Sequence, residues 1–387
     1  MKVEHNIRDT SHHAANSKKG KPAKQQKAKP KAQPEASSSS SAAAADNTSA
    51  DILPLTHQQR LLSSFASAFQ PVLASPAFAT ILQEVKAALY ARDFDAAFTS
   101  AKAESLDAYA ARWSPTRSLA YAVVMLGIAE HLEGLEVQVK KAEDEAGAQP
   151  TTTNPKTQIK KEIKILSIGG GAAELAALAA YLSQQPPYLK GTITLLDAAP
   201  WNPVVSKLHA ALTVPPPVSR YANEAQATAA ALVEPAARLS SSFAQLDALA
   251  MTREELSNTL GGTDPVLVTL LFTLNELYTA AGIGKTTAFL LNLTATVPLG
   301  SLLLVVDSPG SYSEAAVGKE SKKYPMQWLM DHTLVNKPEK DGVFPGCRWE
   351  KVESNDSVWF RLADSLNYPI SLENMRYQMH LYRATKP

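Results

Sequence analysis

Cysteine is almost absent from this 387-residue chain, because Cys347 is the only one. A single cysteine excludes an intrachain disulfide, a CxxC redox pair and a zinc site built from thiolates. The eight histidines are scattered without the spacing of metal ligands, so no metal is expected. So little cysteine is typical of a reducing, intracellular environment.

Long apolar runs are also missing. The longest uncharged apolar stretch, 286–306, contains Asn292 and the breaker Pro298-Leu299-Gly300, so it predicts a helix, a turn and a buried strand instead of a membrane span. No apolar segment follows the first charges of the chain, so no secretory signal is expected. These absences together predict a soluble intracellular protein.

Residues 1–50 contain no aromatic residue and no leucine, and they carry nine basic and four acidic residues in a chain whose net charge is +1. Such a segment buries too little to fold, so we expect a disordered basic tail before a slightly acidic body. Its lysines could be a nuclear or nucleolar address, an RNA contact, or simply solvated.

The rest of the chain divides by composition. Apolar residues at helical spacing, such as Phe78, Ile81 and Val85, predict a helical domain over 51–135. Residues 136–161 are charged and then rich in threonine and proline, which predicts a linker.

Residues 162–387 alternate short apolar runs with helical stretches. Buried parallel strands are predicted at 163–168, 192–196, 266–271 and 302–306, and the short, polar segment 242–247 could form the third strand of the sheet. Helices are predicted at 173–182, 223–232 and 275–281. Near the C-terminus, strand-like runs occur at 348–352, 358–362 and 377–382, the first two forming a hairpin at Asn355-Asp356. This pattern predicts a doubly wound, Rossmann-like α/β domain with an antiparallel C-terminal edge.

A glycine loop follows the first predicted strand. Gly169, Gly170 and Gly171 permit a tight turn and the close approach of a ligand. A dinucleotide fingerprint would place a third glycine where Glu174 stands, and that carboxylate disfavours a pyrophosphate at the helix N-terminus. A ligand with cationic groups would tolerate this acid. A plain strand-to-helix turn stays an alternative.

Acids end the next two predicted strands. Asp197 stands 26 residues after Gly171, where a carboxylate can accept both hydroxyls of an adenosine ribose. Asp247 could lie against the adenine amine. A helix-capping role is the alternative for Asp197.

The segment AGIGKT at 281–286 is similar to a phosphate-binding loop. The motif G-x-x-x-x-G-K-[ST] requires a glycine where Thr279 stands, and the segment follows a predicted helix instead of a strand. Hydrolysis of ATP or GTP is therefore not expected.

Four segments carry a family resemblance: ARWSPTR at 111–117, TLLFTLNE at 269–276, LVVDSPGSYS at 304–313 and LENMRYQ at 372–378. They resemble fungal S-adenosylmethionine-dependent methyltransferases, above all those that methylate N-3 of a uridine in large-subunit (25S) ribosomal RNA. The resemblance covers roughly residues 56–387. It implies a class I methyltransferase sheet, S-adenosylmethionine as cofactor, ribosomal RNA or a pre-ribosome as partner, and action in the nucleus or nucleolus.

The residues limit which atom could be methylated. Methylation at a pyrimidine carbon-5 normally needs a cysteine nucleophile near the fourth strand, and 266–276 has none. The Asn/Asp-Pro-Pro-aromatic loop of amino-group methyltransferases has no counterpart here. An imide nitrogen needs positioning and the loss of its proton, which a carboxylate could assist.

Catalytic residues are expected at the C-terminal ends of the fourth and fifth strands, where open α/β sheets bind ligands. Glu276 and Asp307 are candidates for a base or an orienting group, and Asn275 could bind the uracil edge. Phe272, expected beside the cofactor, or Tyr312 could stack on a flipped base. Glu276 could instead only favour the helix dipole, and the aromatic residues could belong to the core.

Arg112, Trp113 and Arg117 combine charge with a stacking surface, as RNA contacts do, although Trp113 could be a core anchor with solvated arginines around it. The leading interpretation is an RNA methyltransferase. A protein or small-molecule methyltransferase stays open, as does a ribosome-assembly factor that has the fold without turnover.

Overall fold

The computed structural model describes residues 52–139, 159–215, 230–310, 312–317, 320–335 and 346–387, all of which lie in one unit, 47–387. The helices of the first described segment are α2 (Leu55–Ala68), α3 (Gln70–Leu73), α4 (Phe78–Tyr90), the π-helix η1 (Asp95–Thr99), α5 (Ala103–Arg112), α6 (Ser114–Gly127) and α7 (Ala129–Glu133). The later helices are α8 (Ala172–Ser183), α9 (Asn202–Thr213), the 3-10 helix η2 (Ala236–Arg238), α11 (Arg253–Leu260), α12 (Leu274–Thr296) and α13 (Met326–Leu334).

One sheet organises these helices. Its strands are β1 (Val137–Gln138), β2 (Lys161–Ile168), β3 (Leu189–Asp197), β4 (Leu239–Gln245), β5 (Leu267–Leu271), β6 (Leu302–Asp307), β9 (Arg348–Phe360) and β10 (Met375–Thr385). Strands β2 to β6 are parallel and follow the order β4-β3-β2-β5-β6, as in a doubly wound nucleotide-binding sheet. Antiparallel β10 and then β9 extend the sheet beyond β6, and the predicted Rossmann-like fold is confirmed.

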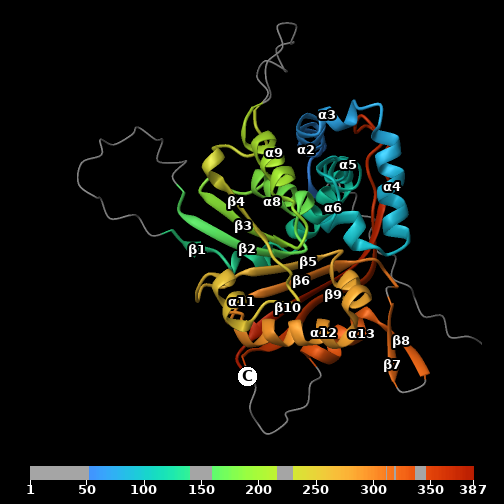
Figure 1. The fold of residues 1–387 in the computed structure, drawn as a ribbon. Helices are drawn as coiled ribbons and strands as arrows, with labels where there is room; N and C mark the ends of the chain where they lie inside the picture. The colour runs from blue at the N-terminus through green and yellow to red at the C-terminus, as the bar shows by residue number, and fades with distance from the viewer. Residues whose placement is uncertain (1–51, 140–158, 216–229, 311, 318–319, 336–345) are drawn as a thin grey trace, which may run out of the picture. The chain divides into compact units, whose positions relative to one another are not determined.

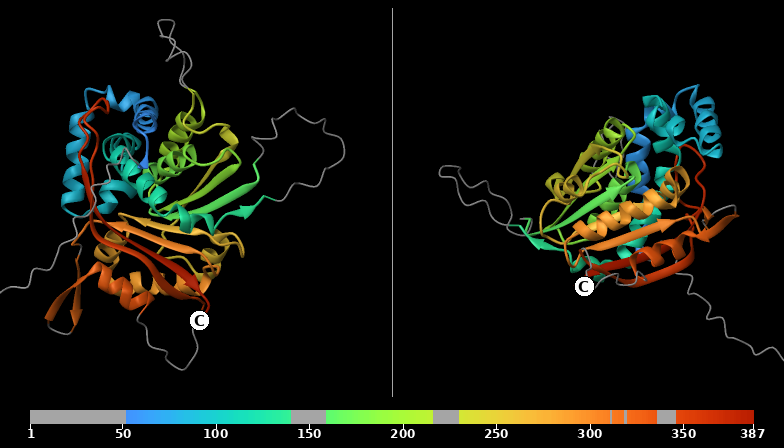
Figure 2. Two further views of the ribbon diagram at one scale, coloured as in Figure 1. Left: turned by 180° about the vertical axis from the view of Figure 1, so that it is seen from behind. Right: turned by 60° about the horizontal axis from the view of Figure 1, so that its bottom comes forward.

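Helices cover both faces of the sheet (Figure 1). On one face α8 packs with α2, α6 and α9, and the turned views of Figure 2 show the N-terminal helices gathered on that side. On the other face α11, α12 and α13 share a second core with Trp349 and Tyr382. Helix α8 is rich in alanine and buried along nearly its whole length, because small side chains let α6 and the sheet approach it closely.

The C-terminal strands differ from the sequence-based prediction. Residues 348–352 and 358–362 do not pair as a hairpin at Asn355-Asp356, because 348–360 is one strand, β9, and its partner is β10. A register shift between Tyr377 and Met379 lies opposite the polar residues of β9, so a bulge accommodates them without a turn. The predicted third strand forms at Leu239–Gln245, which leaves Asp247 in the following loop.

The helix predicted at 223–232 lies mostly outside the described residues, and its last residues, 230–232, are not helical. A separate hairpin, β7 (Tyr312–Val317) and β8 (Glu320–Pro325), follows β6. Among the helices that the structure describes, none is long and apolar enough to cross a membrane.

Candidate active site

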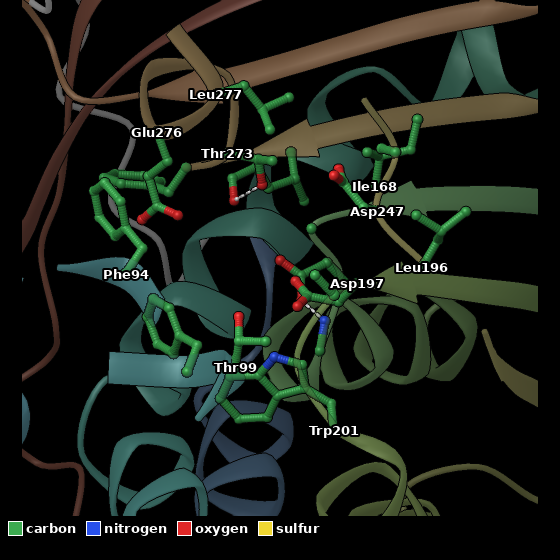
Figure 3. A pocket seen from close by; sticks show the side chains of 18 of the residues that line it. Phe94, Thr99, Ile168, Leu196, Asp197, Trp201, Asp247, Thr273, Glu276 and Leu277 are labelled. Carbon is green, nitrogen blue, oxygen red and sulfur yellow. Dashed lines mark hydrogen bonds between the residues drawn. The ribbon is translucent and has the colours of Figure 1, made fainter. Parts of the chain in front are cut away.

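A cavity of about 390 Å³ opens at the carboxyl ends of the parallel strands (Figure 3). Loops after β2, β3, β4 and β5 line it from the sheet, while η1, α5 and α6 close it from the helical side. This is the edge where open α/β sheets bind ligands, and the volume is typical of small-molecule sites.

The glycine loop forms the floor of this cavity. Gly169 has φ +69°, and a side-chain carbon there would lie 2.4 Å from Thr273 Oγ1. The N–H groups of Gly169 and Gly170 donate to the Leu196 carbonyl, which fastens the loop to the neighbouring strand. Only a glycine can combine this dihedral angle with this close approach.

Glu174 serves the same loop. Its carboxylate accepts a hydrogen bond from the Gly171 N–H at 2.8 Å and so caps the start of α8. Burial raises the pKa of Glu174 to about 7, although the hydrogen bond from the Gly171 N–H acts in the other direction. Gly171 and Glu174 both line the cavity.

Asp197 and Asp247 both line the cavity where the sequence predicts them. Asp197 accepts from the Ala199 N–H at 2.7 Å and from the indole of Trp201. Burial raises its pKa to about 6. Asp247 is exposed and accepts from the Leu249 N–H at 2.9 Å, so each acid also holds its own loop. Figure 3 shows both carboxylates on the same side of the cavity.

Glu276 and Phe272 form the opposite wall with Arg117. The Arg117 guanidinium carbon lies 4.9 Å from the centre of the Phe272 ring, and Arg117 also donates to the Tyr109 hydroxyl. Burial raises the pKa of Glu276 to about 8, although the positive charge of Arg117 acts in the other direction. Phe272 has φ +57°, which is uncommon for a side chain of this size and marks a sharp turn out of β5.

Asp307 and Asn275 lie next to that wall without lining the cavity. Asp307 accepts from the Asn275 N–H at 3.0 Å and from the Ser308 N–H at 2.7 Å, and burial raises its pKa to about 6. Oδ1 of Asn275 is buried and has no hydrogen-bond partner among the residues described. An unpaired buried acceptor of this kind costs stability.

The predicted RNA contacts separate in the structure. Arg117 lies in the cavity wall, whereas Arg112 pairs with Glu373 and Trp113 packs beside the Tyr109 ring. The backbone of Tyr312 begins β7, and its side chain lies outside the described part. No group of three potential metal ligands occurs in the described ranges.

One side of the cavity was not predicted from the sequence. Phe94, Phe98, Thr99, Tyr109 and Trp201 line the cavity, four of them from the helical segment before the sheet. Phe98 and Tyr109 meet edge to face at 5.0 Å, and Trp201 contacts both. Only Trp201 had a local signal, since it follows the predicted ribose-binding acid closely.

Comparisons with known proteins identify the family of this chain. A model of the family described as "Putative SAM-dependent methyltransferase" matches residues 65–383, most of the chain. The chain belongs to this family. It is also 32% identical over 326 residues to the 25S rRNA (uridine(2843)-N(3))-methyltransferase of Saccharomyces cerevisiae, covering 78% of this chain and 76% of the yeast protein.

Two solved structures are similar at low identity. A SAM-dependent methyltransferase of Methanosarcina mazei is 9% identical with a TM-score of 0.31, covering 58% of this chain and 94% of the other. An O-methyltransferase family protein of Burkholderia thailandensis is 12% identical with a TM-score of 0.32, covering 86% and 72%. The assignment depends on the family match and the yeast relative, not on these superpositions.

The cavity of this methyltransferase fits S-adenosylmethionine. Its lining carries four carboxyl groups, Glu174, Asp197, Asp247 and Glu276, and two cations, Arg117 and Lys285. The surplus of acid suits a ligand whose ammonium and sulfonium groups are positive. At Gly169 and Gly170 a side-chain carbon would clash with Thr273 and Ser167, so the loop keeps a bare backbone at the floor of the cavity.

Proposed function

We propose that this methyltransferase acts on N-3 of a uridine in large-subunit ribosomal RNA. The observation that carries the proposal is the 32% identity, over three quarters of both chains, to a yeast enzyme named for that reaction. Because ribosomal RNA is made and modified in the nucleus, we propose that the chain acts there, on the RNA or on a pre-ribosome.

The chemistry of the only cysteine supports a nitrogen target. Methylation at carbon-5 of a pyrimidine needs a reactive thiolate. Cys347 is 2% exposed, lies in the core beneath α12 and does not line the cavity, and burial raises its pKa to about 12. A buried thiol of this kind is inert.

We propose that Gly169, Gly171 and Asp197 hold the cofactor. Asp197 would accept the ribose hydroxyls, and Asp247 would lie towards the adenine. When bound, S-adenosylmethionine supplies a methyl group on a positively charged sulfur. The residues of this chain then have to place a uracil ring against it and remove the N-3 proton.

Glu276 is our candidate for the group that accepts this proton. It lines the cavity, and a pKa of about 8 is close to the working pH, which is where a general base is most effective. Arg117 lies beside it and stabilises the carboxylate form. Phe272 offers a ring for the base to stack on, and Asn275, next to this wall, is the candidate for a hydrogen bond to the uracil edge.

A labelled-methyl assay tests the proposal. Purified protein is incubated with methyl-labelled S-adenosylmethionine and large-subunit ribosomal RNA that lacks the modification, and the nucleosides are separated by mass spectrometry. We expect label in 3-methyluridine, and we expect Glu276→Gln to lower kcat while cofactor binding is kept. Glu255→Gln, at an exposed position of α11, is the matched control. Label in protein or in another nucleoside would contradict the proposal, and bound cofactor with no transfer would indicate an assembly factor.

A further inference from the structure

An exposed tryptophan lies beside two arginines at the carboxyl edge of the sheet. Trp359 is the last residue but one of β9 and is 55% exposed. The guanidinium carbons of Arg376 and Arg361 lie 5.6 and 6.0 Å from the centre of its indole ring. Both distances are within the range of cation–π attraction, so the ring holds two positive groups at the surface. We refer to Trp359, Arg361 and Arg376 as the Trp359 cluster.

The strand register places this cluster beside the catalytic edge. Gln378 of β10 pairs with Asp307, the last residue of β6, and Arg376 pairs with Trp359. Strand β10 runs antiparallel to β6, so Arg376 lies two residues beyond the end of β6, about 7 Å further out at 3.3 Å per residue. The cluster therefore lies at the same carboxyl edge of the sheet as the cavity, on β9 and β10, with β6 between them and β5, whose loop lines the cavity.

The charge of Arg376 is held in place without being neutralised. Its Nε–H donates to Ser357 Oγ at 2.7 Å, and no carboxylate of the described residues forms an ion pair with it. Glu373, which precedes β10, pairs with Arg112 instead. An arginine whose guanidinium carbon lies over an indole and whose Nε is already bonded keeps its other N–H donors, which match the geometry of a phosphate.

A second exposed tryptophan, Trp328, has aromatic neighbours instead of arginines. The Trp328 ring on α13 is stacked between Tyr324 and His332, each ring centre at 5.0 Å. No cation–π contact to Trp328 occurs in the described part of the chain. Of the two, the Trp359 cluster is the one that combines an aromatic ring with positive charge.

We propose that the Trp359 cluster binds the phosphate backbone of the RNA next to the target uridine. This inference rests on the proposed function and adds a surface that positions the substrate. Arg376 and Arg361 contact phosphates, and the indole keeps their guanidinium groups oriented, which lowers the entropy lost on binding. Such contacts set the register of an RNA on a protein and carry little sequence information.

The test compares RNA binding by matched variants. Arg376→Gln and Trp359→Leu are compared with the control Arg348→Gln. Arg348 is an exposed arginine at the first residue of β9, the end of that strand opposite Trp359. The probe is a transcript of the 25S rRNA region around the target uridine, titrated at several KCl concentrations. We expect Arg376→Gln to weaken binding about 5- to 10-fold and to reduce the slope of log K against log salt by about 0.7 to 1.

The controls separate this inference from the proposed function. Trp359→Leu should weaken binding similarly, whereas cofactor affinity and the unfolding temperature should stay at wild-type values in all three variants. If wild type binds and methylates the transcript while Arg376→Gln and Trp359→Leu behave like Arg348→Gln, the cluster is not the RNA surface and the proposed function stands. If wild type neither binds nor methylates the RNA, both proposals fall.

Discussion

Glu276 should make the free protein less stable as the pH rises. Burial moves its pKa from the ordinary 4.5 to about 8 in the folded protein. Between these values the folded state holds a proton that the unfolded state has released, so the free energy of unfolding decreases with increasing pH. The stabilising contribution is complete below about pH 4.5 and is lost as the pH passes about 8.

The size of the expected change in the free energy of unfolding follows from the pKa shift of Glu276. At 1.36 kcal/mol per pKa unit, the whole shift corresponds to about 5 kcal/mol. Arg117, Asp307 and Asp197 interact with Glu276, and such a cluster titrates together, so we assign about 2 to 3 kcal/mol to Glu276 itself. Glu276→Gln is neutral at every pH and should remove that part of the pH dependence.

Urea unfolding of the cofactor-free protein, followed by circular dichroism at about pH 5 and about pH 8.5, measures this difference. The variant should match wild type at the lower pH and be more stable at the higher one. Glu255→Gln is the control, because hydrogen bonds from Thr252 place the pKa of Glu255 below its ordinary value and its contribution is constant over this range. If the free energy of unfolding of Glu276→Gln falls between about pH 5 and about pH 8.5 as much as that of wild type, Glu276 is not the buried carboxyl group that causes the pH dependence.

Three other substitutions test separate parts of the structure. Asp197→Asn keeps the size of the side chain and removes its charge, so calorimetry should show about 10- to 100-fold weaker cofactor binding at an unchanged unfolding temperature; unchanged affinity would exclude Asp197 from the cofactor site. Gly169→Ala forces a side-chain carbon towards Thr273 Oγ1 at a positive φ, and should cost about 1 to 3 kcal/mol of unfolding free energy; a neutral result in urea unfolding would contradict this tight floor. The buried guanidinium of Arg238 donates to four backbone carbonyls in and before β3, those of Leu182, Gln185, Pro186 and Leu189. Arg238→Met leaves these carbonyls unpaired, so it should lower the free energy of unfolding by about 3 kcal/mol without changing cofactor affinity per folded molecule.

The sheet could be predicted from the sequence because its signals are local. Strands buried on both faces appear as short apolar runs, and each predicted parallel strand forms within a few residues of its expected position. The glycine floor and Asp197 were found for a related reason, since a loop that follows a strand directly must lie at the sheet edge. The hairpin predicted at Asn355-Asp356 was wrong because two polar residues look the same in a turn and in a bulge on an exposed edge strand.

Features that depend on distant contacts could not be predicted. Phe94, Phe98 and Thr99 lie far from the sheet in the sequence, and no spacing indicates that they would close the cavity. Arg117 carried a charge that suited RNA or solvent equally well, and only the packing of α6 against α8 places it beside Phe272. The roles proposed for these residues in binding and catalysis stay predictions for the assays above.

The most direct test of the central claim uses the yeast relative. In S. cerevisiae lacking its 25S rRNA (uridine(2843)-N(3))-methyltransferase, this chain or its Asp197→Asn variant is expressed, and 25S rRNA is analysed by nucleoside mass spectrometry with immunoblots for protein level. We predict that the wild-type chain restores 3-methyluridine and that the variant restores much less at equal abundance. An abundant wild-type chain that restores no 3-methyluridine would contradict the account.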